Sequence, residues 1–317
     1  MCSDANDRVR PGYLPTTAFT ILSEAFFDDR GRPVPFRLRD KRNTQDDPFD
    51  EYVTDLLRGR LPAEVIVLRA DKPLVSPDAV IARPEEYELL KAGGVDYDPG
   101  AIFGLEVKKV DLGRNGKPAR STGLDYNSTP PCATIRVYAE DGNEIRIPGF
   151  YLFVALERGG GRDTVHVHSM ALVAGAVLNK DVDLYDRTTG TRTKQIRLGT
   201  YGDGANRVRP MWLFSNPLGW EWTLGAATLI SDRDDLADDP SLAHVRAMTR
   251  TVSPGVSELF HCYRLGKLSP PVEETAHDPF PQPPRRKEET AQRGRFEIDM
   301  RTLTLGESAH RERRRPR

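Results

Sequence analysis

The feature that most constrains the fold is a series of short, β-branched apolar runs that follows one well-marked helix. Asp47-Pro48 is a favourable helix start, because an N-cap residue precedes Pro at the first helical position. Apolar residues then recur on one helix face at Phe49, Val53, Leu56 and Leu57. Strand-like runs follow at 64–68, 78–82, 102–107, 134–138, 144–147 and 150–156, with a helical segment at 85–92. Strands interspersed with helices predict an α/β fold.

The chain divides by composition into three segments. Residues 1–45 are Arg-rich with one apolar patch, and we expect an N-terminal arm or a short helix there. Residues 46–269 hold the strand-like runs and form the main predicted domain. Residues 270–317 are rich in Pro and Arg, and 281–317 contain 11 basic and 6 acidic side chains, so a largely disordered basic tail is expected.

Two apolar segments late in the domain are harder to interpret. Residues 165–178 are apolar with one Gly, which leaves strand and helix both open. After Asp239-Pro240, the spacing of Leu242, Val245 and Met248 predicts a helix.

Several classes of protein are excluded by composition. No run approaches the ~18 apolar residues of a membrane span, and the first residues are acidic and polar with no apolar signal core. The three cysteines, Cys2, Cys132 and Cys262, contain no C-x-x-C, which excludes a disulfide scaffold and a four-cysteine zinc site. A reducing cytoplasm fits best, with no membrane partner and no organic cofactor expected.

The constellation with the clearest chemistry is Pro77-Asp78 followed by Glu106-Val107-Lys108. Each is unique here: the chain has one Pro-Asp and one acid-x-Lys. Side chains at i and i+2 of a strand share a face, so Glu106 and Lys108 project together, while Asp78 opens the preceding strand. Two carboxylates suit Mg²⁺, which lowers the pKa of bound water, and a lysine beside them can orient that water or stabilise charge on phosphate. An exposed edge strand with a solvated Glu/Lys pair is the alternative.

These residues resemble the PD-(D/E)xK nuclease superfamily, and more narrowly its type II restriction endonucleases. The resemblance rests on Ser76-Pro77-Asp78 and on 103–109, and it covers roughly residues 47–110. It implies a restriction-endonuclease-like fold, a central mixed β-sheet flanked by helices. Asp78 and Glu106 would be metal ligands, Lys108 the catalytic lysine, and Glu51 a possible additional acid from the preceding helix. It also implies cleavage of double-stranded DNA, and a homodimer that matches palindromic sites. In this family a helix usually follows the strand that carries the acid and the lysine. The segment 111–131 is rich in Gly, Pro and polar residues and does not fit a helix.

Two polar segments are candidates for DNA contact. The irregular segment 120–129 combines Arg, Asn, hydroxyl and aromatic side chains, of the kinds that contact bases and phosphates. An ordinary structured connection explains it equally well. A second segment places two arginines two residues apart, where surface salt bridges are the default alternative. The candidate DNA-binding residues are Arg120, Ser121, Thr122, Asp125, Tyr126, Asn127, Arg207 and Arg209.

Other candidates are weaker. His166 and His168 would share a strand face, but no third metal ligand stands at a telling spacing. His261-Cys262 suggests a thiol nucleophile only weakly, since adjacent residues seldom face each other. Asp96 or Asp98 could take the place of Asp78 as the first acid of the site. They lie only 8–10 residues before Glu106, which leaves room for a hairpin at most.

The leading hypothesis is therefore a Mg²⁺-dependent, sequence-specific DNA endonuclease of restriction type. Two alternatives stay open: a nuclease-like fold that binds DNA or a protein without cutting, and a structure-specific nuclease of DNA repair.

Overall fold

The computed structural model describes residues 12–42, 47–69, 77–113, 133–159, 164–178, 227–253 and 256–266. The candidate DNA-binding residues at 120–127 and at 207 and 209, and the predicted disordered tail, lie outside these ranges. Within them, no helix has both the length and the apolar character needed to cross a membrane.

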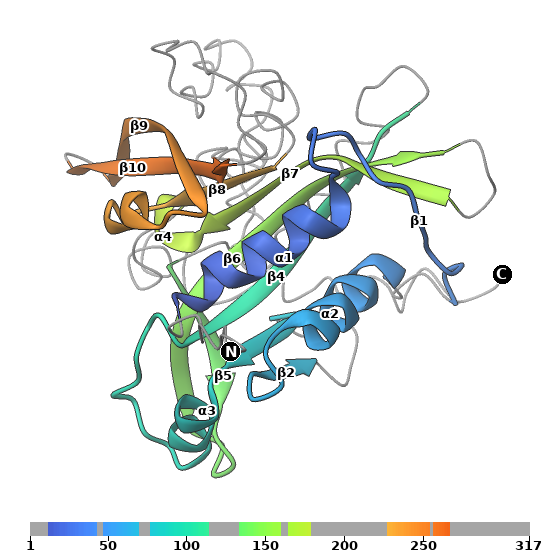
Figure 1. The fold of residues 1–317 in the computed structure, drawn as a ribbon. Helices are drawn as coiled ribbons and strands as arrows, with labels where there is room; N and C mark the ends of the chain where they lie inside the picture. Colours follow the sequence, from blue (N-terminus) through green and yellow to red (C-terminus); the bar gives the residue numbers. More distant parts are fainter. Residues whose placement is uncertain are drawn as a thin grey trace, which may run out of the picture.

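One large mixed sheet organises the described residues (Figure 1). Its strands follow the order β2-β3-β4-β6-β7-β8-β10-β9, while β1 pairs with β7 and β5 pairs with β6. The β4/β6 and β7/β8 pairs are parallel and the other pairs are antiparallel. The strands are β1 (Phe36–Arg37), β2 (Ile66–Arg69), β3 (Ala79–Ala82), β4 (Ile102–Asp111), β5 (Thr134–Tyr138), β6 (Glu144–Arg158), β7 (Thr164–Ala174), β8 (Ala227–Ser231), β9 (Leu242–Ser253) and β10 (Val256–Leu265).

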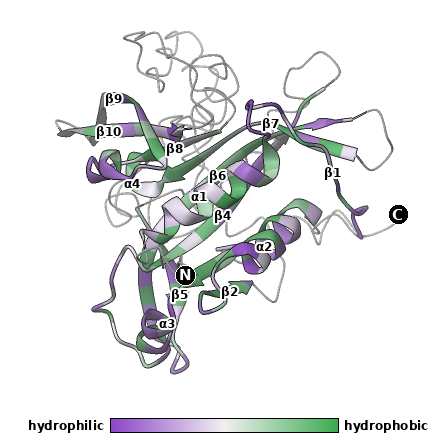
Figure 2. Cartoon of the chain, in the orientation of Figure 1, coloured by the Kyte–Doolittle hydropathy of each residue, from purple (hydrophilic) through white to green (hydrophobic). Residues whose placement is uncertain are grey.

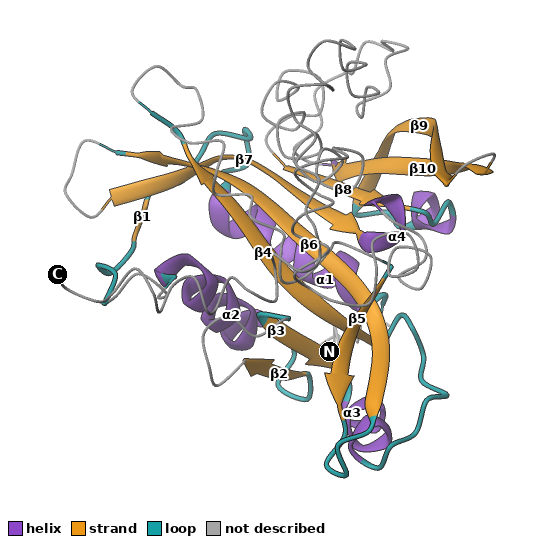
Figure 3. Ribbon diagram, turned by 180° about the vertical axis from the view of Figure 1, so that it is seen from behind, coloured by secondary structure: helices purple, strands orange, loops and turns teal. Residues whose placement is uncertain are grey.

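The two longest helices of the described part cover one face of this sheet. α1 (Leu14–Phe26) and α2 (Pro48–Arg60) lie in front of the strands in Figure 1 and behind them in Figure 3. The predicted α/β architecture, a central mixed sheet flanked by helices, is confirmed. Short helices complete it at α3 (Pro84–Lys91), α4 (Gly175–Leu178) and a 3₁₀ turn, η2 (Asp235–Asp238).

The core lies between these helices and the central strands. Phe19, Leu22 and Phe26 of α1 and Phe49 of α2 are fully buried there. Figure 2 shows the central strands as mostly hydrophobic, while α3 and the nearby turns are hydrophilic. Burying these side chains removes apolar surface from water and holds both helices on the sheet.

Local signals placed α2 correctly. The helix begins at Pro48, and the Asp47 side chain accepts a hydrogen bond from the backbone N–H of Phe49 at 3.0 Å. The apolar stripe predicted from Phe49 through Leu57 faces the core. Asp141-Gly142-Asn143 is a turn sequence that predicts a hairpin, and it does join β5 to β6, with Gly142 at φ +83°.

One expectation is wrong, and the structure decides two that were left open. Of the arm and the short helix expected near the N-terminus, residues 14–26 form the helix, whose apolar face is buried against the sheet. Residues 242–253 form strand β9 rather than a helix, since pairing with β10 along its length satisfies the backbone. The ambiguous segment 165–178 is mostly strand β7, ending in the single turn α4.

Candidate active site

The candidate site lies where β3 begins and where β4 continues beyond its pairing with β3, with only β6 beside it. Strand β3 pairs with β4 only from Ile102 to Leu105, whereas β4 runs on to Asp111. Asp78 directly precedes β3, and its Oδ2 accepts a hydrogen bond from the backbone N–H of Val107 at 2.7 Å. The Asp78 carboxylate thus takes the place of a β3 carbonyl beside Glu106.

Strand β4 contributes an acid and a lysine to the same place. The Nζ of Lys108 donates to Oε1 of Glu106 at 2.5 Å, and the two side chains are 15% and 7% exposed. Both residues therefore share one face of the strand, as their i, i+2 spacing predicts. A buried pair of this kind is not the solvated edge pair considered from the sequence.

The surroundings of Asp78 disfavour the charged form of its carboxyl group. Burial, and then repulsion from Glu106, raises the pKa of Asp78 well above its ordinary value. Burial opposes the charge on Lys108, but attraction to Glu106 and Asp78 prevails and raises the pKa of its ammonium. The site brings two carboxyl groups to one ammonium group, so an added cation would favour the ionised form of Asp78.

Helix α2 adds a third acid, Asp50. Burial is the main cause that raises the pKa of Asp50, followed by repulsion from Asp78 and Asp47. The positive charges of Lys109 and Lys108 act in the opposite direction. Asp50 therefore belongs electrostatically to the cluster of Asp78, Glu106 and Lys108, which we call the carboxylate cluster.

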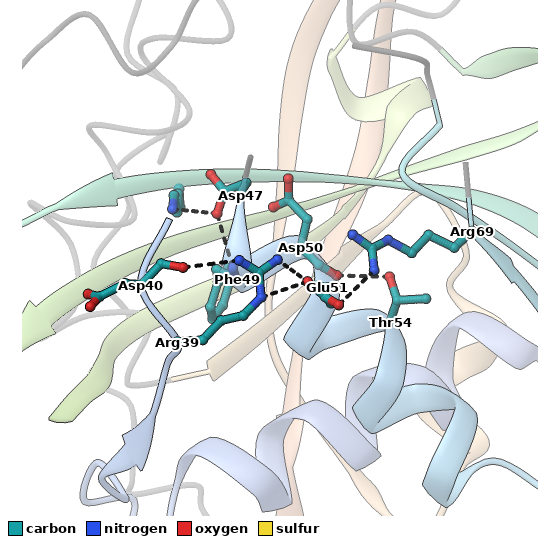
Figure 4. A network of polar contacts seen from close by, with 9 residues as sticks. Arg39, Asp40, Asp47, Phe49, Asp50, Glu51, Thr54 and Arg69 are labelled. Carbon is teal, nitrogen blue, oxygen red and sulfur yellow. Dashed lines mark hydrogen bonds and ion pairs between the residues drawn. The ribbon is translucent and has the colours of Figure 1, made fainter. Parts of the chain in front are cut away.

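Glu51, the helix acid expected from the resemblance, faces elsewhere. Its carboxylate accepts a hydrogen bond from Nε of Arg39 at 2.9 Å, pairs with Nη2 of the same residue, and lies 3.3 Å from Nη1 of Arg69. Figure 4 shows the Asp50 and Glu51 carboxylates pointing in different directions from the helix. Hydrogen bonding to Arg39 is the main cause that lowers the pKa of Glu51.

A sequence signal for Asp50 was available. Asp50 precedes Val53 by three residues and Leu57 by seven, so it lies on the buried stripe of α2, whereas Glu51 lies off that stripe. An acid on a buried stripe is costly unless it is paired or functional. That rule would have favoured Asp50 over its neighbour.

A second ion pair fixes the start of α2 against β4. The Nζ of Lys109 lies 2.5 Å from Oδ1 of Asp47, the same oxygen that accepts from the N–H of Phe49. The N-cap is therefore tied to the strand that carries Glu106 and Lys108. This contact positions the first turn of the helix, and with it Asp50.

The absence of a side chain at Gly104 of β4 helps to position Asp78. A Cβ added at Gly104 would lie 3.2 Å from Cγ and 3.3 Å from Cβ of Pro77, and 3.3 Å from Cδ1 of Ile135. Glycine therefore lets Pro77 pack directly onto the strand, one residue before Asp78.

The histidine pair and the alternative acids, which were the weaker candidates, contact residues outside the carboxylate cluster. His166 and His168 face Glu157 of β6, at 3.0 Å and 3.6 Å. Asp98 accepts a hydrogen bond from the N–H of Gly100 within a turn, and Asp96 is exposed.

The pair His261-Cys262 does not form a thiol–imidazole dyad. The ring of His261 contacts His244, with 3.2 Å between the two ring nitrogens. Cys262 is fully buried in the core, and burial raises the pKa of its thiol to about 12. A buried protonated thiol is a poor nucleophile.

Searches for relatives leave the resemblance as a prediction. No protein-family model, no curated protein and no solved structure matches the chain. Within the described ranges, no group of three or more His, Cys, Asp or Glu side chains could by itself hold a metal ion.

Proposed function

We propose that the chain is a Mg²⁺-dependent DNA endonuclease of restriction type, with Asp78, Glu106 and Lys108 as its catalytic residues. The observation that carries this proposal is the convergence of the half-buried carboxyl group of Asp78, at the start of β3, with the buried Glu106 and with Lys108 of β4. The raised pKa of Asp78 supports the proposal, because strongly shifted pKa values are concentrated at functional sites.

The donor set fits Mg²⁺ in particular. This ion is commonly held by one or two carboxylates and completes its shell with water and substrate phosphate. Asp78 and Glu106 would supply the protein oxygens, so a closed group of three ligands is not required. When bound, the ion supplies a water of lowered pKa and neutralises charge on the phosphate.

The chain's own residues have distinct roles in this proposal. Lys108 orients the attacking water or stabilises the negative charge that develops on phosphate oxygens. Glu106 holds the Lys108 ammonium in place, and Asp50 adds negative charge that favours a cation. Lys109 and Asp47 keep Asp50 beside the strand without contacting substrate.

Substrate, assembly and compartment follow from the same proposal. Double-stranded DNA is the substrate, cut at a short specific sequence, and a homodimer would match the two-fold symmetry of such sites. The few cysteines and the buried thiol of Cys262 support a cytoplasmic location. Arg120 to Asn127 and Arg207 and Arg209 remain the candidate base and phosphate contacts.

Digestion of a defined plasmid tests the proposal. The wild-type protein with Mg²⁺ is expected to give discrete bands, and Asp78→Ala and Lys108→Ala are each expected to abolish cleavage. Circular dichroism and a DNA-binding assay serve as controls, since both variants should fold and still bind. Full cleavage by both variants would remove the catalytic assignment, and cuts at mismatches or ends would indicate a repair nuclease.

A binding module that does not cut DNA is the second candidate. It is favoured by one observation, the short bond that already engages Lys108 with Glu106. Such a module would leave plasmid intact at every Mg²⁺ concentration while still shifting DNA in a gel.

A further inference from the structure

The ion-pair network around Glu51 joins two arginines to one carboxylate. Arg39 donates to Glu51 through Nε and Nη2, and Arg69 contacts the other carboxylate oxygen through Nη1. Both guanidinium groups thus converge on the carboxylate of Glu51. The side chains of Arg39 and Arg69 are 31% and 38% exposed, so solvent, and any ligand, reaches both.

This network lies beside the carboxylate cluster. Arg69 pairs with Ala79 across the β2/β3 ladder, and Ala79 follows Asp78 directly. Glu51 follows Asp50 on α2, and Figure 4 shows both arginines converging on Glu51 next to Asp50. The two arginines thus border the carboxylate cluster at the end of β3 where Asp78 and Ala79 lie.

From this arrangement we propose that Arg39 and Arg69, held by Glu51, bind a backbone phosphate of the nucleic-acid strand next to the one that is cut. The proposal rests on the proposed function, since it names a substrate contact of that site. A nucleic-acid strand places a phosphate about every 3.4 Å of helix axis, so a strand held at the cluster presents further phosphates close by.

The chemistry of the side chains suits this role. The planar guanidinium group binds phosphate through parallel N–H donors, and it does so best when its orientation is fixed beforehand. Glu51 supplies that fixation. The carboxylate cluster repels phosphate, so an adjacent cationic pair offsets the repulsion and sets the strand in register.

The test measures binding without cleavage. Fluorescence anisotropy of a labelled DNA duplex in EDTA would compare wild type, Arg39→Ala, Arg69→Ala and a control, Arg32→Ala. Arg32 is exposed and pairs with Asp28 outside this network. We expect Arg39→Ala and Arg69→Ala each to weaken binding about tenfold, and to reduce the slope of log K against log salt by about 0.9. Arg32→Ala should bind like the wild type.

A merely structural ion pair would not change the salt slope. Wild-type affinity and slope in both alanine variants would overturn the proposal. If an alanine variant unfolds, Arg69→Lys replaces it, because lysine keeps the positive charge but lacks the paired N–H donors of the guanidinium group. This variant is expected to bind DNA more weakly with an unchanged salt slope. Wild-type affinity would overturn the proposal.

The same variants separate this proposal from the nuclease proposal. Cleavage by the wild type, together with unchanged binding by the arginine variants, overturns the phosphate contact and leaves the nuclease. Arginine-dependent binding without any cleavage overturns the nuclease and supports the phosphate contact.

Discussion

Asp50 and Glu51 are neighbours on one helix, yet their surroundings differ in kind. Asp50 is surrounded by other acids, and burial and repulsion raise the pKa of its carboxyl. Glu51 is surrounded by two arginines, and its pKa is lowered. Consecutive helix residues project about 100° apart, so one residue turns towards the sheet and the next towards the loop that carries Arg39.

The difference separates two uses of charge. The Glu51 network brings two arginines to one carboxylate and suits an anion, whereas the carboxylate cluster brings three carboxyl groups to one lysine and suits a cation. Uncompensated charge costs folding free energy, and proteins retain it mainly where a ligand neutralises it. Substitutions that change one of these two acids and leave the other intact test whether their roles differ.

The largest expected effect is on cleavage. Asp50→Asn should lower the rate of Mg²⁺-dependent cleavage about 100-fold or more, because the cluster loses charge that favours the ion. Glu51→Gln, the matched change one residue away, should lower it less than tenfold. Single-turnover cleavage of a short duplex measures both rates, and equal losses would contradict the distinction.

A smaller loss of cleavage is expected from Gly104→Val. The new side chain would displace Pro77, and Asp78 would then move away from the N–H of Val107. We expect about tenfold slower cleavage, because small misplacements of catalytic groups reduce rates steeply. Gly59→Ala is the control, since nothing lies within 4 Å of a Cβ added there.

A third prediction concerns stability rather than rate. The pKa values of Asp50 and Asp78 are raised in the folded state, so the folded protein binds more protons and its unfolding free energy falls as pH rises above the ordinary carboxyl range. Asp50→Asn should flatten this fall and raise Tm by a few degrees at pH 8 without metal. Thermal unfolding in EDTA from pH 5 to pH 9 measures the effect; a steeper fall in the variant would refute the charge imbalance.

The smallest effect should have the opposite sign. The lowered pKa of Glu51 stabilises the folded state above the ordinary carboxyl pKa, and that stability is lost as pH falls through the lowered value. Glu51→Gln should therefore cost about 0.5–1 kcal/mol at pH 7, as is usual for a partly exposed ion pair. The cost should disappear at low pH, which urea unfolding at pH 7 and pH 3 would reveal.

The order of local elements was predictable where the residues carried their own signals. The N-cap and Pro of α2, the strand-like run of β5, and the Gly142 turn are local features, and each appears as predicted. β9 was not predictable in this way. The spacing of Leu242, Val245 and Met248 fits a helix, but long-range pairing with β10 outweighed that local periodicity.

The sequence alone determined the α/β class, the shared face of Glu106 and Lys108, and the helix that delivers an acid to them. Tertiary structure decided which acid that is, and it gave residues 14–26 a place in the core. The physical reason is that helical and strand periodicity are set by the local backbone, whereas charge balance depends on side chains brought from distant parts of the chain. Arg39 and Arg69, for instance, reach Glu51 from separate elements, and only folding brings them to that carboxylate.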